Sequence, residues 1–168
     1  QSSSGGFSYF YGEPPSVPLT AYALEFLRAA APYVNVESKV IERAERWLLS
    51  RQADNGSWSS SARVTAAIAS LLAQIKAAPK ALARAVEWLE VQNRTDPYVY
   101  AGLLQAHLKL GNKQRAAAVV NRIVELAQSN SGGTYWTLDG ETPYHSAIRS
   151  GGTETTALLA QALRAAVS

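Results

Sequence analysis

Three carboxylates in the C-terminal third of the chain are of the type that general acid–base chemistry uses. Asp139 and Glu141 lie two residues apart, and Glu154 follows Thr153. Hydrolysis of a glycosidic bond needs two carboxyl groups that face one cleft at a defined separation. However, Asp139 and Glu141 lie in a Thr-Leu-Asp-Gly-Glu-Thr turn pattern, and Glu154 has the place of an acidic residue in the first turn of a helix. We therefore expect these carboxylates to have structural roles, and a glycoside hydrolase is the alternative.

The two histidines and the absence of cysteine argue against a metal site and against a cysteine nucleophile. His107 lies in an apolar stretch, and His145 lies beside Tyr144 in a long irregular segment. A zinc site needs further ligands close to either histidine, and the sequence offers none. The chain has no cysteine, which excludes a disulfide, a thiolate metal site and a cysteine nucleophile within it. We expect His107 to be a hydrogen-bonded core or rim residue, His145 to be exposed, and the chain to hold no catalytic, cofactor-binding or metal site.

The elements that would position these residues are helices of two alternating kinds. Amphipathic helices carry apolar side chains at positions i, i+3, i+4 and i+7, and their other side is exposed to solvent. Helices that are apolar nearly all round must be covered on most sides. The amphipathic segments are 35–50, 80–90 and 112–128, and the apolar ones are 17–31, 62–75, 96–110 and 153–167.

This alternation predicts an inner layer of helices wrapped by an outer layer. We expect an all-α fold of about seven helices, an α/α toroid that is partial or forms an open arc, in a single domain over residues 1–168. Asp96-Pro97 has the pattern of a helix start and Gly111 that of a helix stop. Only residues 7–11 and 134–138 have extended patterns. The irregular stretch 129–152 exceeds the ~12–15 residues usual in compact loops, so we expect it to be functional or mobile.

An internal repeat links the outer helices. Arg43-Ala44-x-x-Trp47-Leu48 is followed, 41 positions later, by Arg84-Ala85-x-x-Trp88-Leu89. Glycine-aromatic turns also recur, around residues 5–9, 56–58 and 132–136. Such repeats are typical of stacked units that cover one another's apolar faces. Trp47, Trp58 and Trp88 are therefore expected to fill gaps between inner and outer helices, in preference to lining a carbohydrate or isoprenoid cavity.

Composition excludes several classes of protein. The formal charge is only +3, and the charges alternate in sign along residues 37–51, so we expect no nucleic-acid binding. No uncharged apolar run reaches the ~18 residues of a membrane span. The chain has no methionine, which we interpret as the mark of a mature product or an excised piece. The apolar segment 17–31 should either self-associate or be shielded by Phe7, Tyr9, Phe10 and Tyr11.

Six motifs together resemble a known family. They appear in the order seen in the thioester domain of the alpha-2-macroglobulin and complement family, and the resemblance extends from Gly5 to Ala166. Residues 52–58 alone also resemble the glutamine–tryptophan signature shared by α/α-toroid proteins such as triterpene cyclases. The six motifs are residues 19–24, 47–58, 64–68, 110–112, 135–136 and 154–159.

The resemblance implies a function for the parent protein. It would be a large secreted or periplasmic protease trap, in which cleavage of a bait region triggers a conformational change and the thioester couples to the protease. The resemblance implies that the family's thioester is made from a Gly-Cys-Gly-Glu-Gln segment upstream of the region matched here, and this chain has no cysteine. Complement-type members carry a histidine before the next inner helix, where Trp58 here runs through Ser59–Arg63 into Val64. The chain therefore resembles bacterial members, some of which lack the thioester. Its partners would be other domains of the same large chain and, through them, target proteases.

Other toroid enzymes remain the alternative to this interaction domain. A terpene-cyclase-like protein would need an aspartate-rich acid motif, which the sequence lacks, and a zinc prenyltransferase would need a cysteine ligand. We therefore expect a non-enzymatic helical domain of a protease inhibitor, located outside the cell or in the periplasm.

Overall fold

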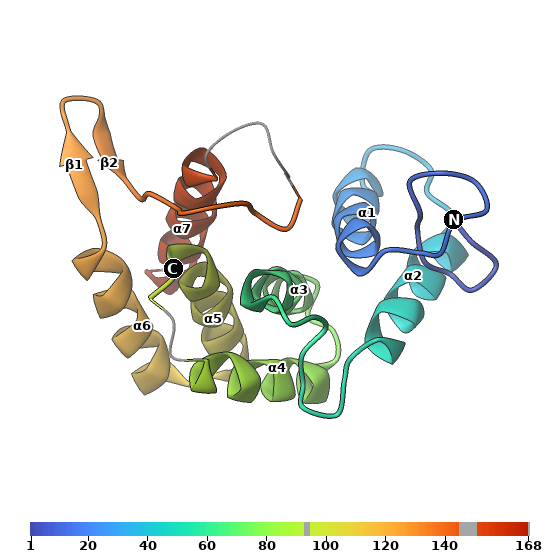
Figure 1. Cartoon of the computed structure of the whole chain (residues 1–168), viewed down its shortest axis with the longest axis horizontal. Helices are drawn as coiled ribbons and strands as arrows, with labels where there is room; N and C mark the ends of the chain where they lie inside the picture. Colours follow the sequence, from blue (N-terminus) through green and yellow to red (C-terminus); the bar gives the residue numbers. More distant parts are fainter. Residues whose placement is uncertain (93–94, 145–150, 168) are drawn as a thin grey trace. The chain divides into compact units, whose positions relative to one another are not determined.

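The chain folds almost entirely into α-helices. The computed structural model describes residues 1–92, 95–144 and 151–167. Within them a single antiparallel hairpin pairs β1 (Gln128–Asn130) with β2 (Gly133–Tyr135), Gln128 lying opposite Tyr135. The prediction of an all-α fold is confirmed (Figure 1). The helices are α1 (Val17–Ala30), α2 (Ser38–Ser50), α3 (Ala62–Gln74), α4 (Pro79–Val91), α5 (Pro97–Leu110), α6 (Lys113–Glu125) and α7 (Gly152–Ala166).

These elements form two compact units, Gln1–Asp54 and Asn55–Ser168. The first unit holds the N-terminal segment, α1 and α2, with α1 packed on α2. The second unit holds α3 to α7 and the hairpin. None of the described helices is both long and apolar enough to cross a membrane.

The second unit has the predicted alternation of inner and outer helices. Helix α5 packs against α3 on one side and α7 on the other, while α4 covers α3 and α5, and α6 covers α5 (Figure 1). Burial follows the same division, since α3 buries eleven of its thirteen residues and α6 buries only Ala116 and Ile123. The apolar sequence of α3 and the amphipathic sequence of α6 thus reflect an inner and an outer position.

Small residues let the inner helices approach each other. A Cβ atom on Gly102 of α5 would lie 2.4 Å from the carbonyl oxygen of Ala66 in α3. That separation is far inside van der Waals contact, so the α3–α5 spacing requires glycine at this position. The alanine-rich sequence of α3 serves the same close packing.

A glycine-aromatic turn precedes three of the inner helices, and it is anchored in the same way each time. In each turn the backbone N–H of an aromatic residue donates a hydrogen bond to a threonine Oγ1 in the following helix. These bonds join Phe7 to Thr20 (2.8 Å), Trp58 to Thr65 (3.2 Å) and Trp136 to Thr156 (3.1 Å). The threonine therefore satisfies a backbone donor that the turn would leave buried without a partner.

Two of these turns also contact the outer helix of their own unit. A Cβ atom on Gly5 would lie 2.5 Å from the carbonyl oxygen of Arg43 in α2, and one on Gly56 would lie 2.3 Å from that of Arg84 in α4. Both glycines have positive φ angles, 107° and 93°, which L side chains rarely adopt. Arg43 and Arg84 are equivalent positions of the internal repeat, so that repeat corresponds to a real structural module.

The predicted start of α5 at Asp96-Pro97 and its predicted end at Gly111 are confirmed. Asp96 caps α5, its carboxylate accepting hydrogen bonds from the backbone N–H groups of Tyr98 and Val99. Gly111 ends the same helix in the left-handed conformation, with φ 74°. Residues 7–11 form no strand, although their pattern looked extended. Of the second extended pattern, 134–138, only the first two residues lie in β2.

Trp47 and Trp88, which were both expected to fill gaps between inner and outer helices, differ in burial. Trp47 is 5% exposed, whereas Trp88 is half-buried. In the first unit Gly6 lies directly against the Trp47 ring, and a Cβ atom there would come within 2.7 Å of it. The equivalent position in the second unit is Ser57, whose hydroxyl bonds to Asn55 instead. The two tryptophans thus differ in burial although they hold equivalent positions of the repeat.

The N-terminal aromatic residues do not form the predicted shield. Tyr9, Phe10 and Tyr11 are largely exposed, and so are Tyr22 and Phe26 on α1. Only Phe7 is half-buried, because its backbone N–H is fixed to Thr20. Of the two alternatives expected for the apolar segment 17–31, shielding by these aromatic residues is therefore not observed, and self-association stays a prediction.

Candidate functional site

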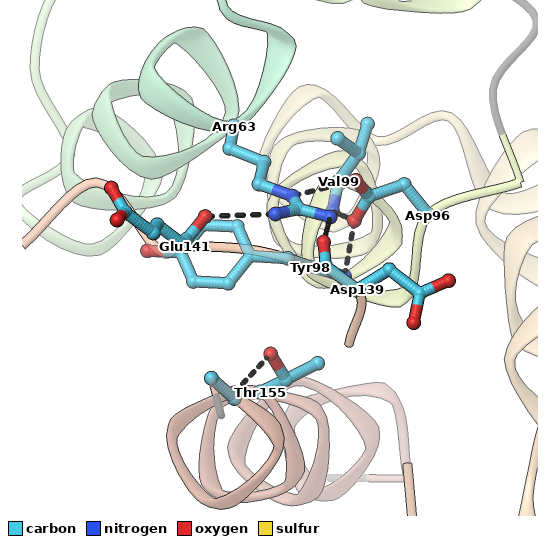
Figure 2. A network of polar contacts seen from close by, with 8 residues as sticks. Arg63, Asp96, Tyr98, Val99, Asp139, Glu141 and Thr155 are labelled. Carbon is cyan, nitrogen blue, oxygen red and sulfur yellow. Dashed lines mark hydrogen bonds and ion pairs between the residues drawn. The ribbon is translucent and has the colours of Figure 1, made fainter. Parts of the chain in front are cut away.

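The candidate site forms around Arg63, in the first turn of α3. Its side chain joins three segments that are far apart in sequence: α3, the start of α5 and residues 139–141 (Figure 2). The Nε atom lies 2.7 Å from Asp96 Oδ2, and the two terminal nitrogens donate to the carbonyl oxygens of Glu141 (2.8 Å) and Asp139 (2.7 Å). Each nitrogen of the guanidinium group therefore has a partner, and the arrangement is a clasp.

Asp96 has two roles in this clasp. Its Oδ1 atom caps α5, while its Oδ2 atom pairs with Arg63. Both side chains are largely buried, with exposed fractions of 20% for Arg63 and 13% for Asp96. Partial burial with matched hydrogen bonds makes such a pair worth more than an exposed ion pair.

The carboxylates of Asp139 and Glu141 do not form a catalytic pair. Their backbone carbonyls bind Arg63, while their carboxylate groups point away from each other (Figure 2). Gly140 between them has a φ of 81°, which reverses the chain direction. The expectation that these residues act as turn formers agrees with this geometry, and the facing carboxylates of a glycoside hydrolase are not present at this turn.

Glu154 lies in the first turn of α7 and contacts the last residue of that turn pattern, Thr142. Its Oε2 atom accepts a 2.6 Å hydrogen bond from Thr142, and its Oε1 atom accepts one of 3.3 Å from the hydroxyl of Tyr98. Both carboxylate oxygens are thus engaged in fixing residue 142 and α5 against α7. The predicted position at a helix start is confirmed, and the N-terminal end of the helix dipole adds to the stability of the charge there.

A groove runs between the 135–139 segment and α7. It has a volume of about 830 Å³ and is bordered by Trp136, Leu138, Asp139, Thr153 and Ala157 among others. Asp139 is its one carboxylate within the described residues. A groove of this composition can hold an apolar group but offers no acid–base pair.

His107 is a buried core residue, as the sequence suggested. Its side chain is 1% exposed, and its Nε2 atom lies 3.2 Å from Glu90 Oε1. Burial lowers the pKa of His107 from its ordinary value of 6.5; the Glu90 carboxylate acts to raise it, and Arg115 to lower it. Glu90 also binds Arg115 of α6 at 2.5 Å, so this cluster connects α4, α5 and α6.

Within the parts of the chain that the structure describes, no group of three His, Asp or Glu side chains is placed to hold a metal ion. His145 lies outside the described residues, as does part of the 129–152 stretch. The described part of that stretch contributes the hairpin turn and the carbonyls that bind Arg63.

Sequence reasoning missed Arg63 as an organising residue. Its partners at positions 139 and 141 are 76 and 78 residues away, and they bind through backbone atoms that any residue type would supply. The one available signal was a charged residue within the first turn of an otherwise uncharged helix, Ala62–Gln74. The connection from Trp58 to Val64, where the family resemblance expects a histidine, ends in this arginine.

Comparison with known proteins supports the family resemblance over the first 67 residues. The family model of the A-macroglobulin TED domain matches residues 1–67. No curated protein matches the chain. The match contains the whole first unit, the second glycine-aromatic turn and Arg63. Residues 1–67 are therefore similar to an A-macroglobulin TED domain, the thioester-containing domain of the alpha-2-macroglobulin and complement family.

Proposed function

We propose that this chain is a non-catalytic helical domain of an alpha-2-macroglobulin-like protease inhibitor. The observation that carries the proposal is the match of residues 1–67 to the A-macroglobulin TED domain. The anchored turns support an extension beyond residue 67, because the Trp136–Thr156 bond repeats the Phe7–Thr20 and Trp58–Thr65 bonds. The target proteases act on the whole protein, and this chain contributes a scaffold to it.

The site supports a structural role for the polar residues that could have done chemistry. Arg63 uses its guanidinium group to hold Asp96 and two backbone carbonyls, and Glu154 accepts bonds from Tyr98 and Thr142. The chain contains no cysteine from which a thioester could be formed. Any covalent bond to the protease would then be formed by a part of the parent protein other than these 168 residues.

A labelled primary amine tests the non-catalytic part of the proposal. A thioester reacts with small amines, and the adduct is seen as a stoichiometric gain in intact mass. We expect no mass gain for this chain, whereas a thioester-containing domain of the same family serves as the positive control. A stoichiometric adduct on this chain would contradict the proposal.

Trapping itself is tested on the parent protein with one endopeptidase and two substrates. A trap blocks digestion of a large protein substrate, which cannot reach the enclosed protease, but leaves hydrolysis of a small peptide substrate. We expect this difference for the parent protein and equal, uninhibited digestion of both substrates with this chain alone. Equal digestion of both substrates with the parent protein would refute the inhibitor function.

A further inference from the structure

A cationic hollow lies in the first unit, where the N-terminal segment meets α2. It has a volume of about 470 Å³, and its border includes Arg43, Arg46, Arg51, Trp47 and Ser3. Arg43, Arg46, Trp47 and Ser50 follow the i, i+3, i+4, i+7 spacing, so they share one face of α2, and Arg51 caps its end. No carboxylate borders the hollow.

The nearest acidic residues of α2 do not neutralise this face. Glu45 pairs with Arg28 of α1 at 2.5 Å, and Glu42 binds Arg46 only through its backbone carbonyl. Arg43, Arg46 and Arg51 form no ion pair with a carboxylate among the described residues. The hollow therefore concentrates three positive charges in a chain whose total formal charge is only +3.

The structure also orients the arginine side chains. Arg43 donates to the carbonyl oxygens of Ser2 (2.9 Å) and Ser3 (2.8 Å), which fixes the N-terminal segment at the edge of the hollow. The guanidinium group of Arg51 lies over the Trp47 ring, 4.9 Å from its centre. Contact through the face of a guanidinium group leaves the N–H groups at its edge available for an anion.

The internal repeat shows that this charge is not required by the fold. In the second copy the positions equivalent to Arg46, Ser50 and Arg51 are Glu87, Val91 and Gln92. The arginine whose backbone carbonyl contacts the turn glycine is present in both copies, as Arg43 in the first and Arg84 in the second. The shared packing uses only backbone carbonyls of the outer helices, so it explains neither Arg46 nor Arg51.

We propose that this hollow binds a tetrahedral oxyanion, the phosphate or sulfate group of a small molecule. Planar guanidinium groups donate paired hydrogen bonds to phosphate and sulfate oxygens, and three of them suit an anion that bears more than one charge. The C-terminal end of α2 opposes an anion with a partial charge of about −0.5, which three full positive charges exceed. A carboxylate has fewer oxygens and one charge, so we expect it to bind less tightly.

The proposal is tested by NMR titration of the whole chain at constant ionic strength. The probes are inorganic phosphate, inorganic sulfate, glycerol 1-phosphate and, as the planar monovalent anion, acetate. We expect saturable shifts of the Arg43, Arg46 and Arg51 Nε–H signals and of the Trp47 indole signal with the first three probes. Tighter binding of glycerol 1-phosphate would identify an ester-borne group, and tighter binding of the inorganic ions would identify the free anion; either result supports the site.

The repeat supplies the decisive variant. The double variant R46E/R51Q places the residues of the second copy in the first, and we expect affinity for the oxyanion to fall about tenfold or more. The variant K109Q/K113E makes the same change of net charge at two exposed lysines of the second unit, and it should keep the affinity. The backbone spectrum of each variant verifies that it is folded.

Three outcomes would overturn the proposal. They are the absence of saturable shifts, an unchanged affinity in R46E/R51Q, and an equal loss in K109Q/K113E, which would indicate a general charge effect. Acetate binding as tight as that of phosphate would overturn the assignment to a tetrahedral anion.

Discussion

Individual side chains in this protein differ in their roles although their sequence contexts match. Trp47 and Trp88 share the Arg-Ala-x-x-Trp-Leu motif, yet only Trp47 is buried, because Gly6 lets the N-terminal segment lie against its ring. His107 is surrounded by apolar residues, yet it contacts Glu90 and Asn112. The burial and the charge environment of a side chain are therefore set by contacts with residues that are not its sequence neighbours.

Replacing the two tryptophans should have unequal effects on stability. We expect Trp47→Ala to lower the free energy of unfolding by ~3–5 kcal/mol, as is usual for truncation of a buried large aromatic residue. Trp88→Ala should cost about half as much or less, because part of its ring is already in water. Chemical denaturation measures both variants. Equal losses at the two positions would contradict the burial difference.

His107 should make stability depend on pH in the mildly acidic range. Because its pKa is lowered in the folded state, the unfolded chain takes up a proton first as the pH falls below about 6.5. The contribution of His107 to the free energy of unfolding is therefore fully present above this pH, and it is lost as the pH falls towards the lower pKa of the folded state. Denaturation at about pH 7.5 and about pH 5.5 measures the loss, before most carboxylates titrate.

The second histidine provides the control for this pH effect. His107→Gln should reduce the loss of stability between the two pH values, whereas His145→Gln should retain it. If His145→Gln and not His107→Gln reduced the loss of stability between the two pH values, the buried histidine would not be its source.

At the scale of elements, the recurring unit is an anchored turn with its inner helix. The aromatic N–H of the turn binds a threonine in the helix that follows, and in two cases the turn glycine touches an outer-helix carbonyl. The Arg63 clasp adds a long-range contact, tying residues 139–141 to the starts of α3 and α5. The hydrogen bonds of the turns thus orient each inner helix, and Arg63 fixes residues 139–141 against the starts of α3 and α5.

The turn glycine can be tested against a glycine with the same backbone conformation. Gly56→Ala brings a Cβ atom to 2.3 Å from the Arg84 carbonyl oxygen at a φ of 93°, and we expect a loss of at least ~2–3 kcal/mol. Gly12→Ala is the matched control, since its φ is 86° but no atom lies within 4 Å of the added Cβ. It should cost only the backbone strain, about 1 kcal/mol. Equal losses in the two variants would show that the carbonyl contact has no energetic effect.

The clasp predicts a difference between arginine and lysine. Arg63→Lys keeps the charge beside Asp96 but loses the planar group that reaches two further carbonyls, and we expect a cost of about 1–3 kcal/mol. Hydrogen exchange should become faster in residues 137–142 in particular. Arg122→Lys, at an exposed pair with Glu125, should change stability by less than ~0.5 kcal/mol. If exchange in residues 137–142 is unchanged in Arg63→Lys, the clasp does not hold this segment.

At the scale of the whole molecule, the chain consists of two compact units that contain related turn-and-helix modules. The first unit is smaller and leaves Tyr22 and Phe26 of α1 exposed, together with Tyr9, Phe10 and Tyr11. Exposed apolar side chains that form a contiguous patch are typical of surfaces that contact another protein.

We expect the isolated chain to self-associate through these aromatic side chains. Sedimentation should show reversible association that increases with concentration, and the double variant Tyr22→Ser/Phe26→Gln should reduce it. Val124→Gln, which removes an exposed apolar side chain of α6, is the control and should leave association unchanged. A chain that stays monomeric at high concentration would contradict this expectation.

Sequence patterns predicted the helices well because those signals are local. The start of α5 at Asp96-Pro97 and its end at Gly111 depend on neighbouring residues alone. The division into inner and outer helices also follows from periodicity, as the burial of α3 and α6 shows. The Arg63 clasp was not predictable in this way, because it pairs a side chain with backbone carbonyls more than seventy residues away. The unequal burial of Trp47 and Trp88 was missed because the ring of Trp47 is covered by Gly6, a residue 41 positions earlier in the chain.

The contact between turn glycines and outer-helix carbonyls has a consequence for evolution. The atom that approaches Gly5 or Gly56 is a main-chain oxygen, which is the same whichever residue stands at position 43 or 84. A mutation at the glycine therefore has no compensating substitution at its partner. Among relatives we expect an invariant glycine without a covarying position, so contact inference from correlated mutations would overlook these two glycine–backbone contacts.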